Sequence, residues 1–199
     1  MAIRDLLWSC PLCGLEGGLR RGKGEDVCAG CGARFRRGRG SEIVVETADG
    51  RTERRPAAEW ATLLPAAPRA GGAGEWRRER VRARFATGEA PVYREGDLLG
   101  GVERLGPPLA GELALTADEL VLRLDSGETR RWPLDRLTAV QMSSGTLQIK
   151  ARGEELTTFR FPNGSARLWE ESVAAALRAR YRAAGRGDIV EFQPRIVAR

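Results

Sequence analysis

The chain has 199 residues, with 33 basic and 27 acidic side chains, a formal net charge of +6 and no histidine. The commonest general base is therefore missing, and no apolar run approaches the ~20 residues of a membrane-spanning helix. The apolar content of 42% is typical of a globular protein, and the length allows one medium domain or two small ones.

The four cysteines form two C-x2-C pairs, Cys10 with Cys13 and Cys28 with Cys31, and a glycine follows each pair. Two such turns bring four thiolates to one ion at about 2.3 Å, which is the closed shell of a structural zinc site. The alternatives are disulfides, a redox C-x-x-C, or unrelated core cysteines, and nothing in the sequence indicates an oxidising compartment or a thioredoxin-like βαβ unit. We predict structural Zn²⁺ at these four residues.

The residues around the cysteines carry a family resemblance. Trp8-Ser9-Cys10-Pro11-Leu12-Cys13-Gly14 and Cys28-Ala29-Gly30-Cys31-Gly32-Ala33 resemble the zinc-ribbon superfamily. The resemblance implies two zinc knuckles on β-hairpins. Zinc ribbons as a class bind nucleic acid, bind protein, or hold a domain together. The resemblance therefore indicates the metal but does not distinguish among these functions.

Strand patterns follow at 33–37 and 42–47, and Asp49-Gly50 marks a hairpin turn that returns over 52–55. A short helix is expected at 58–64, which completes an N-terminal domain over residues 1–64. Residues 65–74 are rich in Pro, Ala and Gly and are read as a linker.

A basic helix is expected over 75–87, because Trp76, Arg80 and Ala83 recur at helical spacing and Thr87-Gly88 would end it. Its favoured interpretation is a solvated face that packs Trp76 on a neighbour. Residues 65–87 carry a net charge of +4, whereas residues 88–184 carry −1. The candidate contacts to an anionic surface are Arg77, Arg78, Arg80, Arg82 and Arg84.

Short strands alternate with turns in the next domain, 88–184. They are expected at 111–116, 119–124, 129–134, 137–143, 146–152 and 156–161. Pro133 places its strand at an edge or an end. Asn163-Gly164-Ser165 caps a long amphipathic helix, and Gly185 ends it. The tail, 185–199, contains a further strand pattern at 187–192.

This plan resembles the pleckstrin-homology-like (PH-like) superfold, specifically bacterial PH-like and GRAM-type domains. The motifs are Gly111-Glu112-Leu113-Ala114-Leu115-Thr116, Trp132-Pro133-Leu134, Phe159-Arg160-Phe161-Pro162 and Trp169. The resemblance implies a mainly β, α+β fold: a β-sandwich or barrel capped by one long C-terminal helix. It also implies lipid-headgroup or protein binding. The loop over 116–119 is acidic and would repel a phosphate, so protein recognition in a groove between the helix and the adjoining strand is favoured.

No catalytic motif is found, and we expect a non-enzymatic protein in the cytoplasm, because residues 1–8 hold no secretory segment. The first hypothesis is an adaptor that binds a protein partner, at the membrane face or elsewhere. The second is peripheral binding to anionic lipid through the arginines of 77–84, or an accessory role beside a lipid-metabolising enzyme. The third is nucleic-acid binding through the ribbon, with Arg20, Arg21, Lys23, Arg34, Arg36, Arg37 and Arg39.

Overall fold

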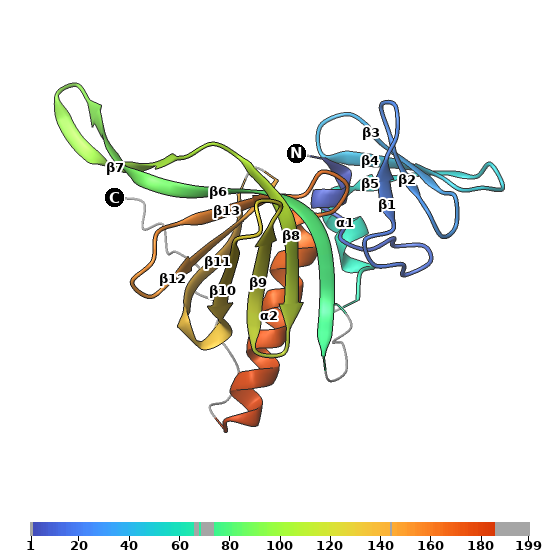
Figure 1. Cartoon of the computed structure of the whole chain (residues 1–199). Helices are drawn as coiled ribbons and strands as arrows, with labels where there is room; N and C mark the ends of the chain where they lie inside the picture. Colours follow the sequence, from blue (N-terminus) through green and yellow to red (C-terminus); the bar gives the residue numbers. More distant parts are fainter. Residues whose placement is uncertain (1, 66–67, 69–73, 144, 186–199) are drawn as a thin grey trace.

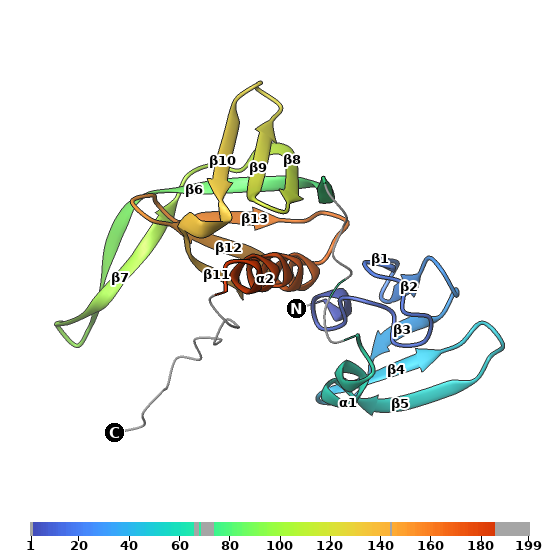
Figure 2. The ribbon, with the colours of Figure 1, turned by 90° about the horizontal axis from the view of Figure 1, so that it is seen from below.

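The computed structural model describes residues 2–65, 68, 74–143 and 145–185 (Figure 1). The chain is mainly β, with two antiparallel sheets and one long helix near the C-terminus. The smaller, N-terminal sheet lies beside one end of the larger, C-terminal sheet (Figures 1 and 2). None of the helices in these ranges has the length and apolarity that crossing a membrane requires.

The N-terminal sheet is a meander in the order β1-β2-β3-β4-β5, flanked by one turn of 3-10 helix and a short α-helix. Its elements are η1 (Ile3–Asp5), β1 (Leu19–Arg21), β2 (Asp26–Cys28), β3 (Arg34–Arg37), β4 (Glu42–Glu46), β5 (Thr52–Pro56) and α1 (Ala57–Thr62). The predicted hairpin turn is confirmed, with Gly50 at φ 84° between β4 and β5. Trp60 of α1 is fully buried against the sheet and donates its indole N–H to the Ile43 carbonyl at 3.1 Å.

The C-terminal sheet has the order β10-β9-β8-β6-β13-β12-β11, and β7 pairs with the far half of β6. Its strands are β6 (Glu75–Arg94), β7 (Asp97–Leu105), β8 (Leu109–Thr116), β9 (Glu119–Leu124), β10 (Thr129–Pro133), β11 (Leu137–Ser143), β12 (Thr146–Ala151) and β13 (Thr157–Arg160). The two edge strands, β10 and β11, are joined by η2 (Leu134–Arg136) and do not pair with each other within the described strands. The sheet is therefore strongly bent but open, not a closed barrel. Pro133 ends an edge strand, as predicted.

The long helix α2 (Ala166–Ala183) packs on the C-terminal sheet, whose core it completes. Ser165 caps it as predicted, because its hydroxyl accepts the Leu168 N–H at 3.2 Å. Trp169 and Val173 are fully buried. Trp169 stacks on Phe161, with ring centroids 5.3 Å apart.

The predicted helix over 75–87 is wrong, because these residues form the first half of strand β6. Burial alternates with a period of two: Val81 and Ala83 are buried, whereas Arg80 and Arg82 are exposed. The helical spacing of Trp76, Arg80 and Ala83 was coincidental. Gly88 does not end the element either, since the strand continues through it with a register shift to β7.

Two further predictions fall largely or wholly on residues outside the described ranges. Of the linker at 65–74, residues 66–67 and 69–73 lie outside them, and so does the strand predicted at 187–192 within the tail. The division into domains at this linker stays a prediction.

Candidate metal centre

Each cysteine pair sits on a turn of the same geometry. In the first turn the Gly14 N–H donates to the Cys10 carbonyl at 2.8 Å, and in the second the Gly32 N–H donates to the Cys28 carbonyl at 2.9 Å. Both glycines are left-handed, with φ 72° and 73°, a region that favours a residue without Cβ. The glycine after each C-x2-C pair is therefore what lets the chain close the turn.

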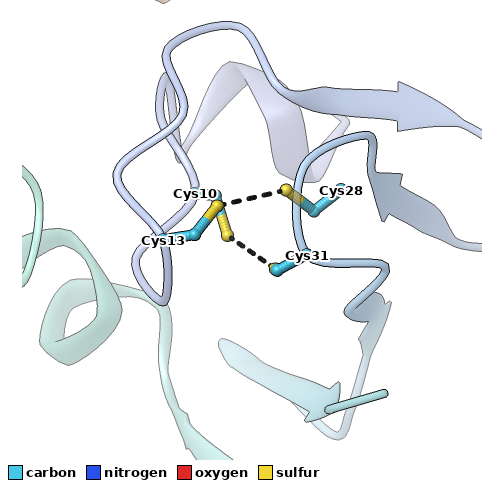
Figure 3. A group of neighbouring side chains, drawn as sticks. All are labelled: Cys10, Cys13, Cys28 and Cys31. Atoms are coloured by element: carbon cyan, nitrogen blue, oxygen red, sulfur yellow. Dashed lines mark hydrogen bonds between the residues drawn. The ribbon is translucent and has the colours of Figure 1, made fainter.

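The two turns bring all four sulfur atoms within 4.8 Å of one another (Figure 3). The Cys10 and Cys31 sulfurs are 3.7 Å apart, and the Cys13 and Cys28 sulfurs are 3.6 Å apart. A tetrahedron with metal–sulfur bonds of about 2.3 Å has sulfur–sulfur edges of about 3.8 Å. The four cysteines are thus positioned to hold a metal ion, and the geometry is compatible with Zn²⁺.

The four cysteines differ in burial, and burial disfavours the negatively charged thiolate form of each side chain. Cys10 and Cys28 are buried in the core of the N-terminal sheet, Cys31 is half-buried and Cys13 is exposed. Burial raises the pKa of the Cys10 and Cys31 thiols. It acts in the same direction on Cys28, but the backbone N–H groups of Cys31 and Gly30 and neighbouring thiols outweigh it, so the pKa of Cys28 is lowered. A divalent cation among the sulfurs would favour the thiolate at every position.

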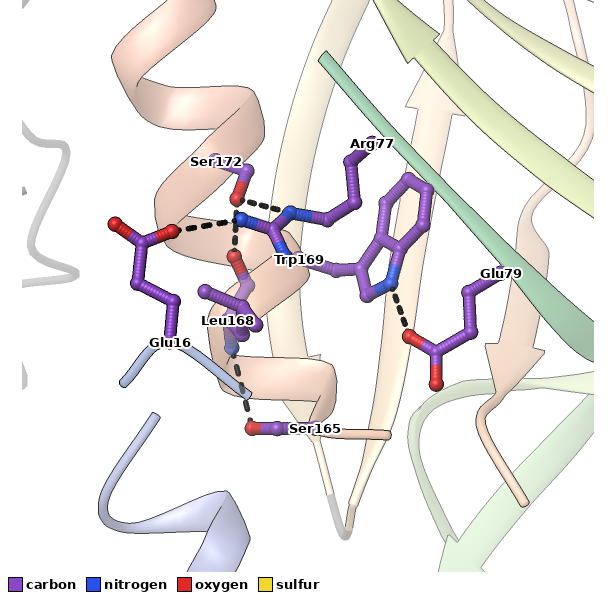
Figure 4. A network of polar contacts seen from close by, with 7 residues as sticks. All are labelled: Glu16, Arg77, Glu79, Ser165, Leu168, Trp169 and Ser172. Atoms are coloured by element: carbon purple, nitrogen blue, oxygen red, sulfur yellow. Dashed lines mark hydrogen bonds and ion pairs between the residues drawn. The ribbon is translucent and has the colours of Figure 1, made fainter. Parts of the chain in front are cut away.

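The cysteine-bearing turns are tied to the C-terminal sheet through side chains (Figure 4). Glu16, which follows the first turn, forms an ion pair with Arg77 of β6 at 3.1 Å. Arg77 also donates to the Ser172 hydroxyl of α2 at 3.0 Å. Beside them, Trp169 of α2 donates its indole N–H to Glu79 of β6 at 2.9 Å. Burial raises the pKa of the Glu79 carboxyl, although this hydrogen bond acts in the opposite direction.

The arginines predicted to contact an anionic surface are mostly engaged within the protein. Arg77 is held at the junction as described above. On the opposite face of β6, Arg78 pairs with Glu75 at 2.5 Å and Glu112 at 2.9 Å, and Arg80 forms two bonds to Asp125 at 2.6 and 2.7 Å. The positive charge of this strand is therefore partly neutralised in place.

The last two arginines of that set differ from each other. Arg84 donates to the carbonyl of Leu105 at the end of β7 at 3.1 Å and to that of Gly106 at 2.8 Å. Arg82 is exposed. No continuous set of unengaged arginines thus runs along β6.

The basic residues of the ribbon are separated by the fold. Arg20 donates to the carbonyl of Asn163, in the loop between β13 and α2, at 3.2 Å, and Arg34 lies 3.6 Å from Glu25. Arg21, Arg36 and Arg37 instead line a cavity at the junction of the two sheets. Lys23 and Arg39 are exposed.

A projecting hairpin, formed by the second half of β6 with β7, was not predicted from the sequence (Figure 1). We call residues 88–102 of this hairpin the arm. Its turn residues, Glu95 and Gly96, have φ 53° and 93°, as a tight hairpin turn requires. Tyr93 and Leu98 face each other across the strands and are 61% and 63% exposed. The signal was present as Glu95-Gly96 between residues able to form strands.

No protein-family model matches the chain, and a search of curated proteins finds no match either. The geometry of its own residues therefore carries the functional interpretation.

Proposed function

We propose that the protein is a non-enzymatic adaptor: a zinc ribbon joined to a PH-like domain, which recognises a protein partner through the arm. The observation that carries this proposal is the exposed apolar surface at the end of a projecting β-hairpin. Tyr93 and Leu98 pair across the strands beside the turn and are 61% and 63% exposed, and Val102 further along β7 is 57% exposed. A paired aromatic and aliphatic side chain exposed at the end of a hairpin is typical of a protein-binding surface.

Zinc is the ion that best suits the cysteine cluster. Four thiolates with tetrahedral spacing form a closed shell, and such a shell leaves no position for a reacting water. The N-terminal sheet has a small core, so a metal supplies stability that burial alone would not. The ion is thus assigned a structural role, and the adaptor is assigned no chemistry of its own.

The strand order supports the PH-like assignment. The first strand of the C-terminal sheet, β6, lies between β8 and the last strand, β13, so it joins two halves of the sheet. The C-terminal helix packs across the open sheet, as the resemblance implies. The proposal thus combines a recognition fold with an added arm.

The arm is a better partner surface than the groove between α2 and β11. In that groove the Met142 N–H points away from β12 and donates to Glu170 of α2 at 2.8 Å. A peptide adding to this edge would have to displace that bond. At the arm, by contrast, the side chains of Tyr93 and Leu98 are already exposed to a partner.

The two alternatives have weaker support. For an anionic membrane, most of the β6 arginines are already engaged, and the arm carries Glu95 and Asp97 at its turn, which an anionic surface would repel. For nucleic acid, the ribbon arginines do not form one continuous surface. An accessory role beside a lipid-metabolising enzyme would itself be a case of protein binding.

Site-specific photocrosslinking tests the proposal. A photoreactive amino acid at Tyr93 or Leu98 of the full chain, expressed under reducing conditions with zinc, should crosslink one discrete protein. The same group at Leu63, which is 46% exposed on the N-terminal side, should not. A Tyr93→Asp, Leu98→Asp variant should lose the partner in a pulldown, while Leu63→Asp should keep it.

Two results would contradict the proposal. Crosslinks that are equal at Leu63 and at the arm would show that the arm has no selectivity. A discrete dimer of the purified chain that Tyr93→Asp disperses would assign the arm to self-association instead.

A further inference from the structure

A cavity of about 770 Å³ lies where the two sheets meet. Its walls come from η1, the β1–β2 turn and the end of β3 on one side, and from Gly145, Thr146 and the end of β13 on the other. Five arginines line it: Arg4, Arg21, Arg36, Arg37 and Arg160. Arg160 belongs to the C-terminal sheet and the others to the N-terminal side, so the junction alone brings them together.

The acidic residues in the lining already have partners. Asp26 accepts the Arg4 backbone N–H at 3.2 Å and lies 3.7 Å from the Arg4 guanidinium. Glu25 lies 3.6 Å from Arg34, and Asp5 accepts a backbone N–H at 3.1 Å. Five cationic and three anionic side chains leave the lining with an excess of two positive charges.

Three of the cavity arginines differ from those of strand β6. Arg21, Arg36 and Arg160 are exposed, and within the described ranges of the chain none of them forms an ion pair. Arg78 and Arg80, by contrast, each bind a carboxylate. A guanidinium offers planar pairs of N–H donors that match the oxygens of a phosphate group.

Arg4 adds a buried positive charge beside the cavity. Its side chain is 11% exposed, and its Nε donates to the Gly164 carbonyl at 3.1 Å. Its Nη1 atom is buried and makes no hydrogen bond within the described residues, since the nearest carboxylate oxygen, that of Asp26, lies 3.7 Å away. A buried guanidinium with incomplete hydrogen bonding favours a nearby anion.

We infer that this cavity binds a compact anion that carries at least two phosphoryl charges. The volume falls in the range of small-molecule sites. Phe161 is the one aromatic residue in the lining that the structure describes, and it is buried in the core, so the cavity lacks a platform on which nucleic-acid bases stack. The ligand is thus a phosphorylated small molecule or a phosphorylated lipid headgroup. Because Arg160 and Arg36 lie on opposite walls, a bound anion contacts both sheets and links them.

Calorimetric titration of the full chain with pyrophosphate tests this inference, with sulfate as the comparison at the same ionic strength. We expect saturable binding of pyrophosphate and weaker binding of sulfate. Arg36→Gln and Arg160→Gln should each weaken binding about tenfold, the effect of losing one charge-assisted contact. Arg54→Gln removes an exposed arginine of β5 outside the cavity and should leave binding unchanged. Circular dichroism checks that each variant is folded.

Either of two results would overturn the inference: no saturable binding at millimolar pyrophosphate, or the same loss of affinity in Arg54→Gln as in the cavity variants.

A second experiment measures binding to phosphatidylcholine vesicles with and without phosphatidylinositol 4-phosphate. Vesicle binding that pyrophosphate displaces identifies a headgroup ligand, and pyrophosphate binding without vesicle binding identifies a soluble one. Vesicle binding that pyrophosphate does not displace would contradict the site. None of these variants lies on the arm, so this test is independent of the partner.

Discussion

Trp169→Phe isolates one hydrogen bond that joins α2 to β6. Trp169 is fully buried, stacks on Phe161 and donates to Glu79 at 2.9 Å. Phenylalanine keeps most of the ring packing and removes the donor. A hydrogen bond to a charged group contributes about 1.5–3 kcal/mol, and a bond to a neutral group about 0.5–1.5 kcal/mol. We therefore expect Trp169→Phe to lower the free energy of unfolding by at least about 1.5 kcal/mol at pH 8.

A double-mutant cycle separates this bond from the loss of ring volume. Glu79→Gln keeps an oxygen acceptor for the indole but removes the charge. In that background, the cost of Trp169→Phe should fall by about 1 kcal/mol, the difference between a charged and a neutral acceptor. The cost is measured by urea unfolding, followed by the helical circular dichroism signal of α2. A Trp169→Phe variant within about 0.5 kcal/mol of the wild type at pH 8 would refute the reasoning, since the bond would then contribute nothing.

Three further predictions concern packing, pH and the metal. Gly111→Ala should lower stability by about 1–3 kcal/mol in urea unfolding, because the new Cβ would lie 2.6 Å from the Arg123 carbonyl oxygen; a loss below about 0.5 kcal/mol would mean that the strands move apart easily. Burial raises the pKa of Glu79, so its contribution to stability is complete below the unfolded value near 4.5 and is lost as pH rises through the raised folded pKa. Thermal midpoints of Glu79→Gln should therefore depend less on pH over that window, and an unchanged pH slope would contradict this assignment. Chelation should unfold the N-terminal sheet, seen in the fluorescence of Trp8 and Trp60, and leave the helical signal of α2; simultaneous loss of both would show that the two sheets fold as one unit.

Much of the fold could be predicted from local patterns. Two C-x2-C pairs with trailing glycines restrict the chain so strongly that the cysteine cluster follows from spacing alone. The strands of the C-terminal sheet after residue 109 are short and separated by turns such as those at Gly127 and Gly153, and Ser165 and the left-handed Gly185 mark the limits of α2. Each of these signals is contained in a few neighbouring residues.

The first strand of the C-terminal sheet could not be predicted in this way. In the first half of β6 the inward positions include Glu79 and Ala83 beside a single β-branched core residue, Val81, and the outward positions are mostly arginines, so the pattern that usually marks a strand is weak. Its charges are stabilised by residues distant in sequence, among them Asp125, which directly follows β9. The cavity was missed for the same reason, since Arg36 and Arg160 meet only after both sheets have formed.

Metal analysis of the purified full chain tests the central claim of a four-thiolate zinc centre most directly. Under reducing conditions we expect one zinc per chain, lost on chelation or in the Cys10→Ser variant. Cobalt substitution should give the absorption of a tetrahedral thiolate site. A folded, metal-free chain with four freely reactive thiols, or one with two disulfides, would contradict it.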